Sequence, residues 1–134
     1  MADTPRGAQR PGTSATLLEA DVTERAAAVV VRLAGEVDAT NVRDAAAVLD
    51  NGLSRALRHG ASVILDLTEV TFFASVGLNL LVTLSQRVQD HQLVVRLAVN
   101  ESAVLRPLQL MGLGDLFPVY STVADALGAP ATGG

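Results

Sequence analysis

The stretch that decides the fold covers residues 62–78 and reads SVILDLTEVTFFASVGL. Its first part, Ser62–Leu67, is a short apolar run typical of a buried strand. Its last residue opens a helical pattern, Leu78–Asp90, in which one stripe is polar (Asn79, Thr83, Gln86, Arg87 and Asp90). The residues between are therefore predicted to join a buried strand to a helix at the carboxyl end of a parallel sheet, the edge where open α/β sheets meet ligands and partners.

Upstream of this stretch the sequence predicts a hairpin and a helix. Thr16–Val22 and Ala26–Ala34 are strand-like runs, separated by a short polar turn around Thr23–Arg25. Thr40–Arg58 has helical spacing; Asp38 or Thr40 can cap its start, and Gly60 lies just past its end. The first strand is expected to be antiparallel to the second, because their connection is too short for a crossover.

Downstream, short strands and helices continue to alternate. We expect a core strand at Leu93–Val99, a helix at Ala103–Met111, a strand at Phe117–Tyr120 and a helix at Thr122–Leu127. The full order is then ββαβαβαβα, which predicts an α/β domain with a mixed, mostly parallel sheet and packed helices. The centre of this sheet should be Ala26–Ala34, Ser62–Leu67 and Leu93–Val99, with Val63, Leu65, Val95 and Leu97 inaccessible.

Composition at the two ends sets the expected domain limits. Residues 1–15 and 129–134 are rich in Pro, Gly, Ala and Thr, so we expect disordered tails there and one folded domain over residues 16–128. A chain of 134 residues with 49% hydrophobic content has enough apolar surface for one core. No apolar run approaches the ~20 residues of a membrane span and no signal peptide is visible, which predicts a cytoplasmic protein with no membrane partner.

Charge and residue usage exclude several functional classes. The net charge of −4 argues against nucleic acid as a partner. The chain has no Cys, and all ten basic residues are Arg, so it has no thiolate nucleophile, no phosphate-loop Lys and no Schiff-base Lys. A metal triad from Glu36, Asp38 and Asp66 is conceivable, but Asp66 is better explained as an acceptor of backbone hydrogen bonds. We therefore expect no enzyme, no metal and no cofactor.

Ser75 is the residue with the clearest functional potential. It lies just before the helical pattern, and Gly77 leaves the backbone of the first turn bare. One interpretation is a plain Ser N-cap with a packing glycine. The other is a phosphoacceptor, because a phosphate at a helix N-terminus meets unpaired N–H groups and the positive end of the helix dipole.

Three segments resemble one family. They are Leu33-Ala34-Gly35-Glu36-Val37-Asp38; Ile64-Leu65-Asp66-Leu67 with Val70-Thr71-Phe72-Phe73-Ala74-Ser75-Val76-Gly77-Leu78; and Leu108-Gln109-Leu110-Met111-Gly112-Leu113-Gly114-Asp115-Leu116-Phe117. In this order they resemble the STAS domain of bacterial anti-sigma-factor antagonists, over about residues 16–128. The resemblance implies a STAS-like fold for the whole domain.

The resemblance also implies a function. Ser75 takes the place of the phosphorylated Ser, and the partner would be an anti-sigma factor that is also a Ser/Thr protein kinase. Unphosphorylated antagonist would bind this kinase and free a sigma factor; phosphorylation would end the binding and a phosphatase would restore it. The expected partner contacts lie on two loops: Gly35, Glu36, Asp38, Thr40 and Asn41 on one, and Ala74, Ser75, Val76, Gly77, Leu78 and Asn79 on the other.

Two positions depart from the family pattern. Ala74 stands where the family usually has Asp, and Val76 where it often has Ser. Either Ser75 is an acceptor that works with a partner adapted to an apolar loop, or it is a residual cap in a STAS module that is regulated differently or not at all. The alternative function is a scaffold subunit, without phosphorylation, of a lipid-transport or signalling assembly.

Overall fold

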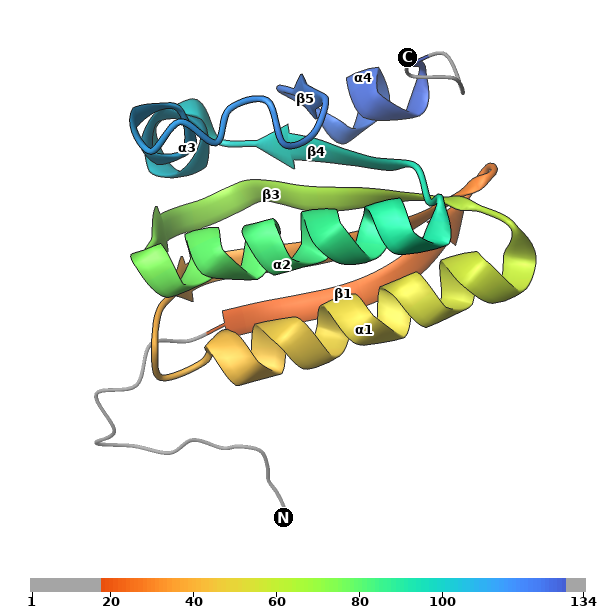
Figure 1. Ribbon diagram of the computed structural model, residues 1–134, viewed down its shortest axis with the longest axis horizontal. Helices are drawn as coiled ribbons and strands as arrows, with labels where there is room; N and C mark the ends of the chain where they lie inside the picture. Colours follow the sequence, from red (N-terminus) through yellow and green to blue (C-terminus); the bar gives the residue numbers. More distant parts are fainter. Residues whose placement is uncertain (1–17, 130–134) are drawn as a thin grey trace.

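The computed structural model describes residues 18–129, which form a five-stranded sheet with strand order β1-β2-β3-β4-β5 (Figure 1). β1 (Leu18–Arg25) is antiparallel to β2 (Ala28–Val37). β2, β3 (Ser62–Phe73), β4 (Val95–Val99) and β5 (Val119–Tyr120) are parallel to one another. The mixed sheet with an antiparallel first strand is therefore confirmed. The predicted tail at 1–15, and residues 130–134 of the tail predicted at 129–134, lie outside the described residues.

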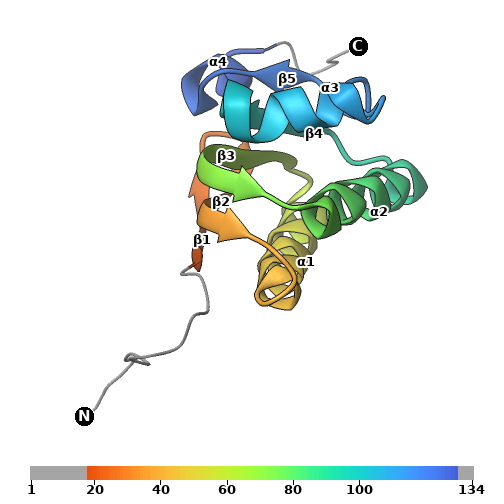
Figure 2. The ribbon, with the colours of Figure 1, turned by 90° about the vertical axis from the view of Figure 1, so that its left-hand side faces the viewer.

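The two long helices cover one face of the sheet. α1 (Val42–His59) and α2 (Ser75–His91) lie side by side on this face (Figure 2). The short α4 (Val123–Leu127) covers part of the other face, where its Ala126 packs with Val30 and Ile64. A π-helical turn (Glu101–Leu105) and α3 (Arg106–Leu110) follow β4. No helix within residues 18–129 is long and apolar enough to cross a membrane.

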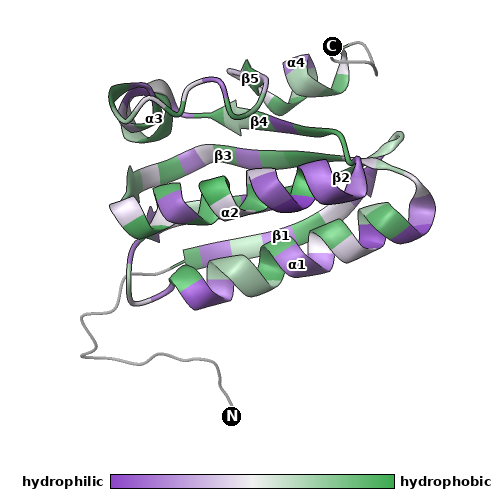
Figure 3. Ribbon diagram, in the orientation of Figure 1, coloured by the Kyte–Doolittle hydropathy of each residue, from purple (hydrophilic) through white to green (hydrophobic). Residues whose placement is uncertain are grey.

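Alternation along the central strands builds the core. Val29, Val31 and Leu33 of β2 belong to the main cluster under the helices, whereas Ala28 and Val30 belong to the smaller cluster under α4. Val63, Leu65, Val95 and Leu97 are all buried, as predicted. Apolar and polar residues also alternate along α1 and α2 (Figure 3), so each helix turns an apolar stripe to the sheet.

The predicted hairpin turn at Thr23–Arg25 is wrong. β1 continues through these residues to Arg25, which pairs with Ala28, and the turn is Ala26–Ala27. Ala26 has φ 52°, in the left-handed region that glycine or asparagine usually occupies. Alanine is not typical of turns, so the sequence pattern favoured a turn at the polar residues that precede it. Residues 16 and 17 of the predicted first strand lie outside the described part of the chain.

The predicted end of β3 at Leu67 is also wrong. The strand runs to Phe73, and its second half stays paired with β2 through Gly35↔Val70 and Val37↔Phe73, after irregularities in the register. α2 consequently begins at Ser75, three residues before the predicted Leu78. The segment from Thr68 to Phe73 is rich in β-branched and aromatic residues, which suits a strand once a neighbour is available to pair with it.

Other boundaries moved by a few residues. α1 begins at Val42, not Thr40, and β4 at Val95, not Leu93. The predicted helix Ala103–Met111 is divided into the π-helical turn and α3, with Pro107 in the first turn of α3. The predicted strand Phe117–Tyr120 is reduced to two residues. The αL residue Gly60 ends α1 as predicted.

Gly52 sets how closely α1 approaches the sheet. It lies on the buried face of α1, and a Cβ placed there would lie 2.2 Å from Cγ2 of Val31 on β2. We predict that Gly52→Ala lowers the free energy of unfolding by roughly 1–3 kcal/mol, because overpacking outweighs the gain in helix propensity. Urea denaturation measures this, with Asn51→Ala on the exposed side of the same turn as the control. Equal stability of the two variants would contradict the close packing.

Candidate functional site

The candidate site lies where β2 and β3 end and α1 and α2 begin, the end of the molecule that faces the viewer in Figure 2. The backbone N–H of Ala74 donates to the carbonyl of Val37 at 2.9 Å, which joins the two connecting segments. The two loops predicted to contact a partner are therefore neighbours in the structure.

Ser75 is the first residue of α2, and it is exposed. The N-cap is Ala74, whose extended backbone (φ −73°, ψ 170°) places its carbonyl to accept from Gly77 N–H at 2.8 Å and Leu78 N–H at 3.3 Å. The interpretation of Ser75 as the N-cap is thus wrong by one residue. Alanine cannot cap with its side chain, and the first turn contains no acidic residue.

Phe73 and Gly77 hold this first turn on the sheet. Phe73 ends β3 and is buried, and a Cβ at Gly77 would lie 2.9 Å from Cε1 and Cζ of its ring. The glycine therefore permits α2 to start directly against an aromatic ring. This contact therefore helps to set the position of the first turn of α2, and with it the position of Ser75.

The loop from Gly35 to Asn41 is organised by its own side chains. The Asn41 amide accepts from the Asp38 N–H at 3.0 Å and donates to the Glu36 carbonyl at 2.8 Å. The Asp38 carboxylate accepts from the backbone N–H and the hydroxyl of Thr40, at 2.9 and 2.6 Å. Asn41, rather than Asp38 or Thr40, is the N-cap residue of α1. Gly35 has φ 102° at the register shift of β2, a conformation that L side chains rarely adopt.

The residues predicted to contact a partner differ in how far they are exposed to solvent. Glu36, Thr40, Ser75 and Asn79 are exposed, and Gly35, Asp38, Ala74 and Val76 are half-buried. Asn41, Gly77 and Leu78 are buried, so they can only shape the surface that a partner would meet. Among residues 18–129 no group of three or more His, Cys, Asp or Glu is placed to hold a metal ion.

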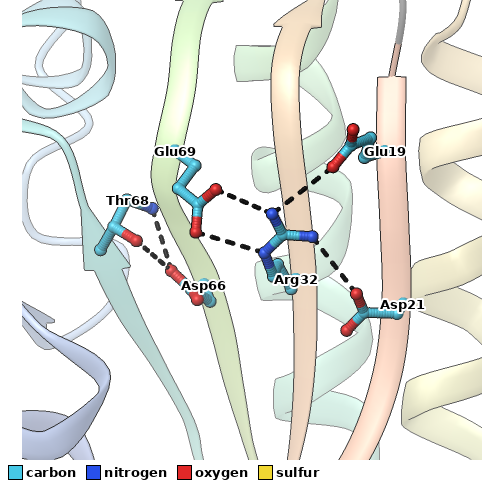
Figure 4. Close-up of polar contacts among 6 residues, drawn as sticks. All are labelled: Glu19, Asp21, Arg32, Asp66, Thr68 and Glu69. Carbon is cyan, nitrogen blue, oxygen red and sulfur yellow. Dashed lines mark hydrogen bonds and ion pairs between the residues drawn. The ribbon is translucent and has the colours of Figure 1, made fainter.

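The residues missed by sequence reasoning surround Arg32 on the face of the sheet away from α1 and α2 (Figure 4). Its guanidinium lies 2.7 Å from Glu69, 3.3 Å from Asp21 and 3.6 Å from Glu19. The hydrogen bond and charge of Arg32 lower the pKa of the Glu69 carboxyl. Nearby, the Asp66 carboxylate accepts from the backbone N–H of Thr68 at 3.0 Å and from its hydroxyl at 2.6 Å. The first of these confirms the prediction that Asp66 accepts a backbone hydrogen bond. Alternating acidic residues in β1 were the available signal for this cluster.

Comparisons with known proteins agree with this fold. The family model described as STAS domain matches residues 18–126. The anti-sigma-F factor antagonist RsfB of Mycobacterium tuberculosis is 30% identical over 99 residues, which are 73% of this chain and 77% of RsfB. The chain therefore belongs to the STAS domain family, and within it to the anti-sigma factor antagonists.

Solved structures show the same architecture. An anti-sigma factor antagonist from Mycobacterium paratuberculosis is 26% identical, with a TM-score of 0.69 over 83% of this chain and 92% of that one. The antagonist SpoIIAA in its unphosphorylated form is 23% identical, with a TM-score of 0.62 over 81% and 93% of the two chains. The latter likeness concerns the fold alone.

Gly77→Ala should disturb the start of α2. The added methyl group must displace the buried Phe73 ring, so we predict a loss of about 1–2 kcal/mol in unfolding free energy despite better helix propensity. Thermal or urea unfolding measures it, with the exposed Asn79→Ala as control. A stabilised Gly77→Ala variant would show that the ring does not hold this turn.

Substitutions at Ala74 should stabilise the start of α2. A capping side chain at this N-cap can accept from the N–H groups of the first turn, so Ala74→Asp and Ala74→Asn should each raise the unfolding free energy by about 0.5–1 kcal/mol. Val76→Asn, inside the helix, is the matched control and should bring no such gain. Loss of stability in both Ala74 variants would mean that residue 74 is not at an N-cap.

Proposed function

We propose that this chain is an anti-sigma factor antagonist whose binding to an anti-sigma factor is switched by phosphorylation of Ser75. The observation that carries the proposal is the exposed hydroxyl at the first residue of α2, beside the loop from Gly35 to Asn41. The partner in this proposal is an anti-sigma factor that is also a Ser/Thr protein kinase. A phosphatase resets the switch, and the proteins act together in the cytoplasm.

A phosphate on Ser75 suits the free domain. Backbone N–H groups at a helix start lack intrahelical acceptors, and the helix dipole favours negative charge there, by about 0.3–1 kcal/mol. The first turn of α2 holds no acidic residue, and Ala74 brings no carboxylate next to the acceptor. The fold should therefore hardly change on phosphorylation.

The bound state is different. A partner that covers Ser75 also covers Val76, which is half-buried and apolar. Phosphate would add about −1.5 to −2 charges at neutral pH, which must lose water at this contact. A charge that is desolvated at an interface without a matching partner costs several kcal/mol of binding free energy. Each 1.4 kcal/mol lowers the affinity tenfold. Electrostatic exclusion of the partner is thus sufficient for the switch, without a conformational change.

The loop from Glu36 to Asn41 supplies the second contact. Its internal hydrogen bonds hold the exposed Glu36 and Thr40 in place, so little order has to be gained when a partner binds. The Glu36 carboxylate faces solvent and can meet Arg or Lys of the anti-sigma factor.

The switch is tested with Ser75→Ala, Ser75→Glu and the control Ser54→Glu, which changes an exposed serine of α1. All three should fold. Ser75→Ala and Ser54→Glu should bind the anti-sigma factor like the parent chain, and Ser75→Glu should bind at least tenfold more weakly, the equivalent of about 1.4 kcal/mol. Isothermal titration calorimetry gives the affinities.

Incubation with the kinase and ATP, followed by mass spectrometry, locates the phosphate. We expect it on Ser75 in the parent chain and on no residue of Ser75→Ala, whose complex should resist release by ATP. If Ser75 carries no phosphate and both Ser75 variants bind like the parent chain, the switch is excluded. A scaffold subunit would then be the better description.

A further inference from the structure

A cavity lies at the end of the sheet opposite to Ser75. It has a volume of about 520 Å³ and is lined from the hairpin turn at Ala26–Ala27, the ends of α1 and α2, the starts of β3 and β4, and the end of α4. This is the right-hand end of the molecule in Figure 1. The volume is within the range of about 300–1,000 Å³ that is usual for small-molecule sites.

Most of the wall is apolar, and part of it is unusually exposed. Ile64, Leu93 and several alanines line the cavity. Leu57 and Val94 also line it, with 45% and 37% of their surfaces exposed, and they are among the few large apolar side chains within residues 18–129 that remain so accessible. Exposed apolar surface gathered in a concave site is a feature of ligand pockets.

The charge of the wall has one sign. No Asp or Glu of the described residues lines this cavity; its ionisable side chains are Arg96 and His91. Arg96 is 4% exposed and lies on β4 beside Ile64 of β3. A guanidinium has five N–H donors in a planar fork that matches a carboxylate, so Arg96 can hold an anion while it keeps another partner.

We propose that this cavity binds an amphipathic carboxylate, with its hydrocarbon chain against Leu57, Val94 and Ile64 and its carboxylate at Arg96. The proposal does not depend on the switch at Ser75, since the two sites occupy opposite ends of the sheet. A bound ligand would leave the surface around Ser75 open to a protein partner.

The test uses the full chain, labelled with ¹⁵N, and decanoate as the probe. Decanoate should shift the amide signals of residues that line the cavity, in a saturable manner with a dissociation constant below about 1 mM. Decyltrimethylammonium has a hydrocarbon chain only one carbon longer and a cationic head, and it should bind at least about tenfold more weakly, because it loses the charge-assisted hydrogen bonds to Arg96. No saturable shift with decanoate, or equal affinity for the two probes, would overturn the proposal.

Two variants locate the site. Leu57→Glu puts a carboxylate in the wall at an exposed position and should weaken decanoate binding at least about tenfold. Leu110→Glu, at a more exposed leucine of α3 that does not line the cavity, is the matched control and should bind like the parent chain. Arg96→Gln should remove the preference for decanoate over decyltrimethylammonium. Equal binding by Leu57→Glu and the parent chain would place the ligand elsewhere and contradict the assignment.

Discussion

The burial of β3 is the constraint on which the rest of this domain depends. The strand pairs with β2 on one side and β4 on the other, and its residues pack into both layers. Val63, Leu65 and Leu67 belong to the cluster under α1 and α2, whereas Ile64 belongs to the cluster under α4. Because β3 then continues to the buried Phe73, the same strand that organises the core also decides where α2 starts and how Ser75 is presented.

Sequence patterns were sufficient for the order of elements and for the central strands. The runs Ala26–Ala34 and Ser62–Leu67 are almost wholly apolar, as covered strands are, and both contain a central strand, although Ala26–Ala27 form the hairpin turn. The end of β3 was not readable in the same way, since Thr68–Phe73 becomes a strand by pairing with β2 across an irregular register. The hairpin turn was missed because Ala26 adopts a left-handed conformation with no residue type to signal it.

The structure brings the two predicted loops together, but it differs from the sequence-based interpretation in how their residues are used. Ser75 and Gly77 do lie in the first turn of a helix, but the cap belongs to Ala74, since the helix begins three residues earlier than the periodicity suggested. Asn41 was expected to meet a partner, yet its side chain connects Asp38 with Glu36 inside the loop. These hydrogen bonds depend on the folded conformation of the loop. The spacing of the residues in the sequence therefore did not predict them.

The edge strand β1 is held partly by ion pairs to Arg32, whereas the centre of the sheet is held by buried apolar contacts. β1 is mostly exposed, and beyond its backbone pairing with β2 it is held on this face by carboxylates that approach one guanidinium. Ions in solution screen exposed charges over about 8–10 Å at physiological strength, whereas they leave buried apolar contacts intact. Added salt therefore weakens the ion pairs around Arg32 in part and leaves the apolar contacts of the interior unchanged, so the attachment of β1 depends on ionic strength more than the core does.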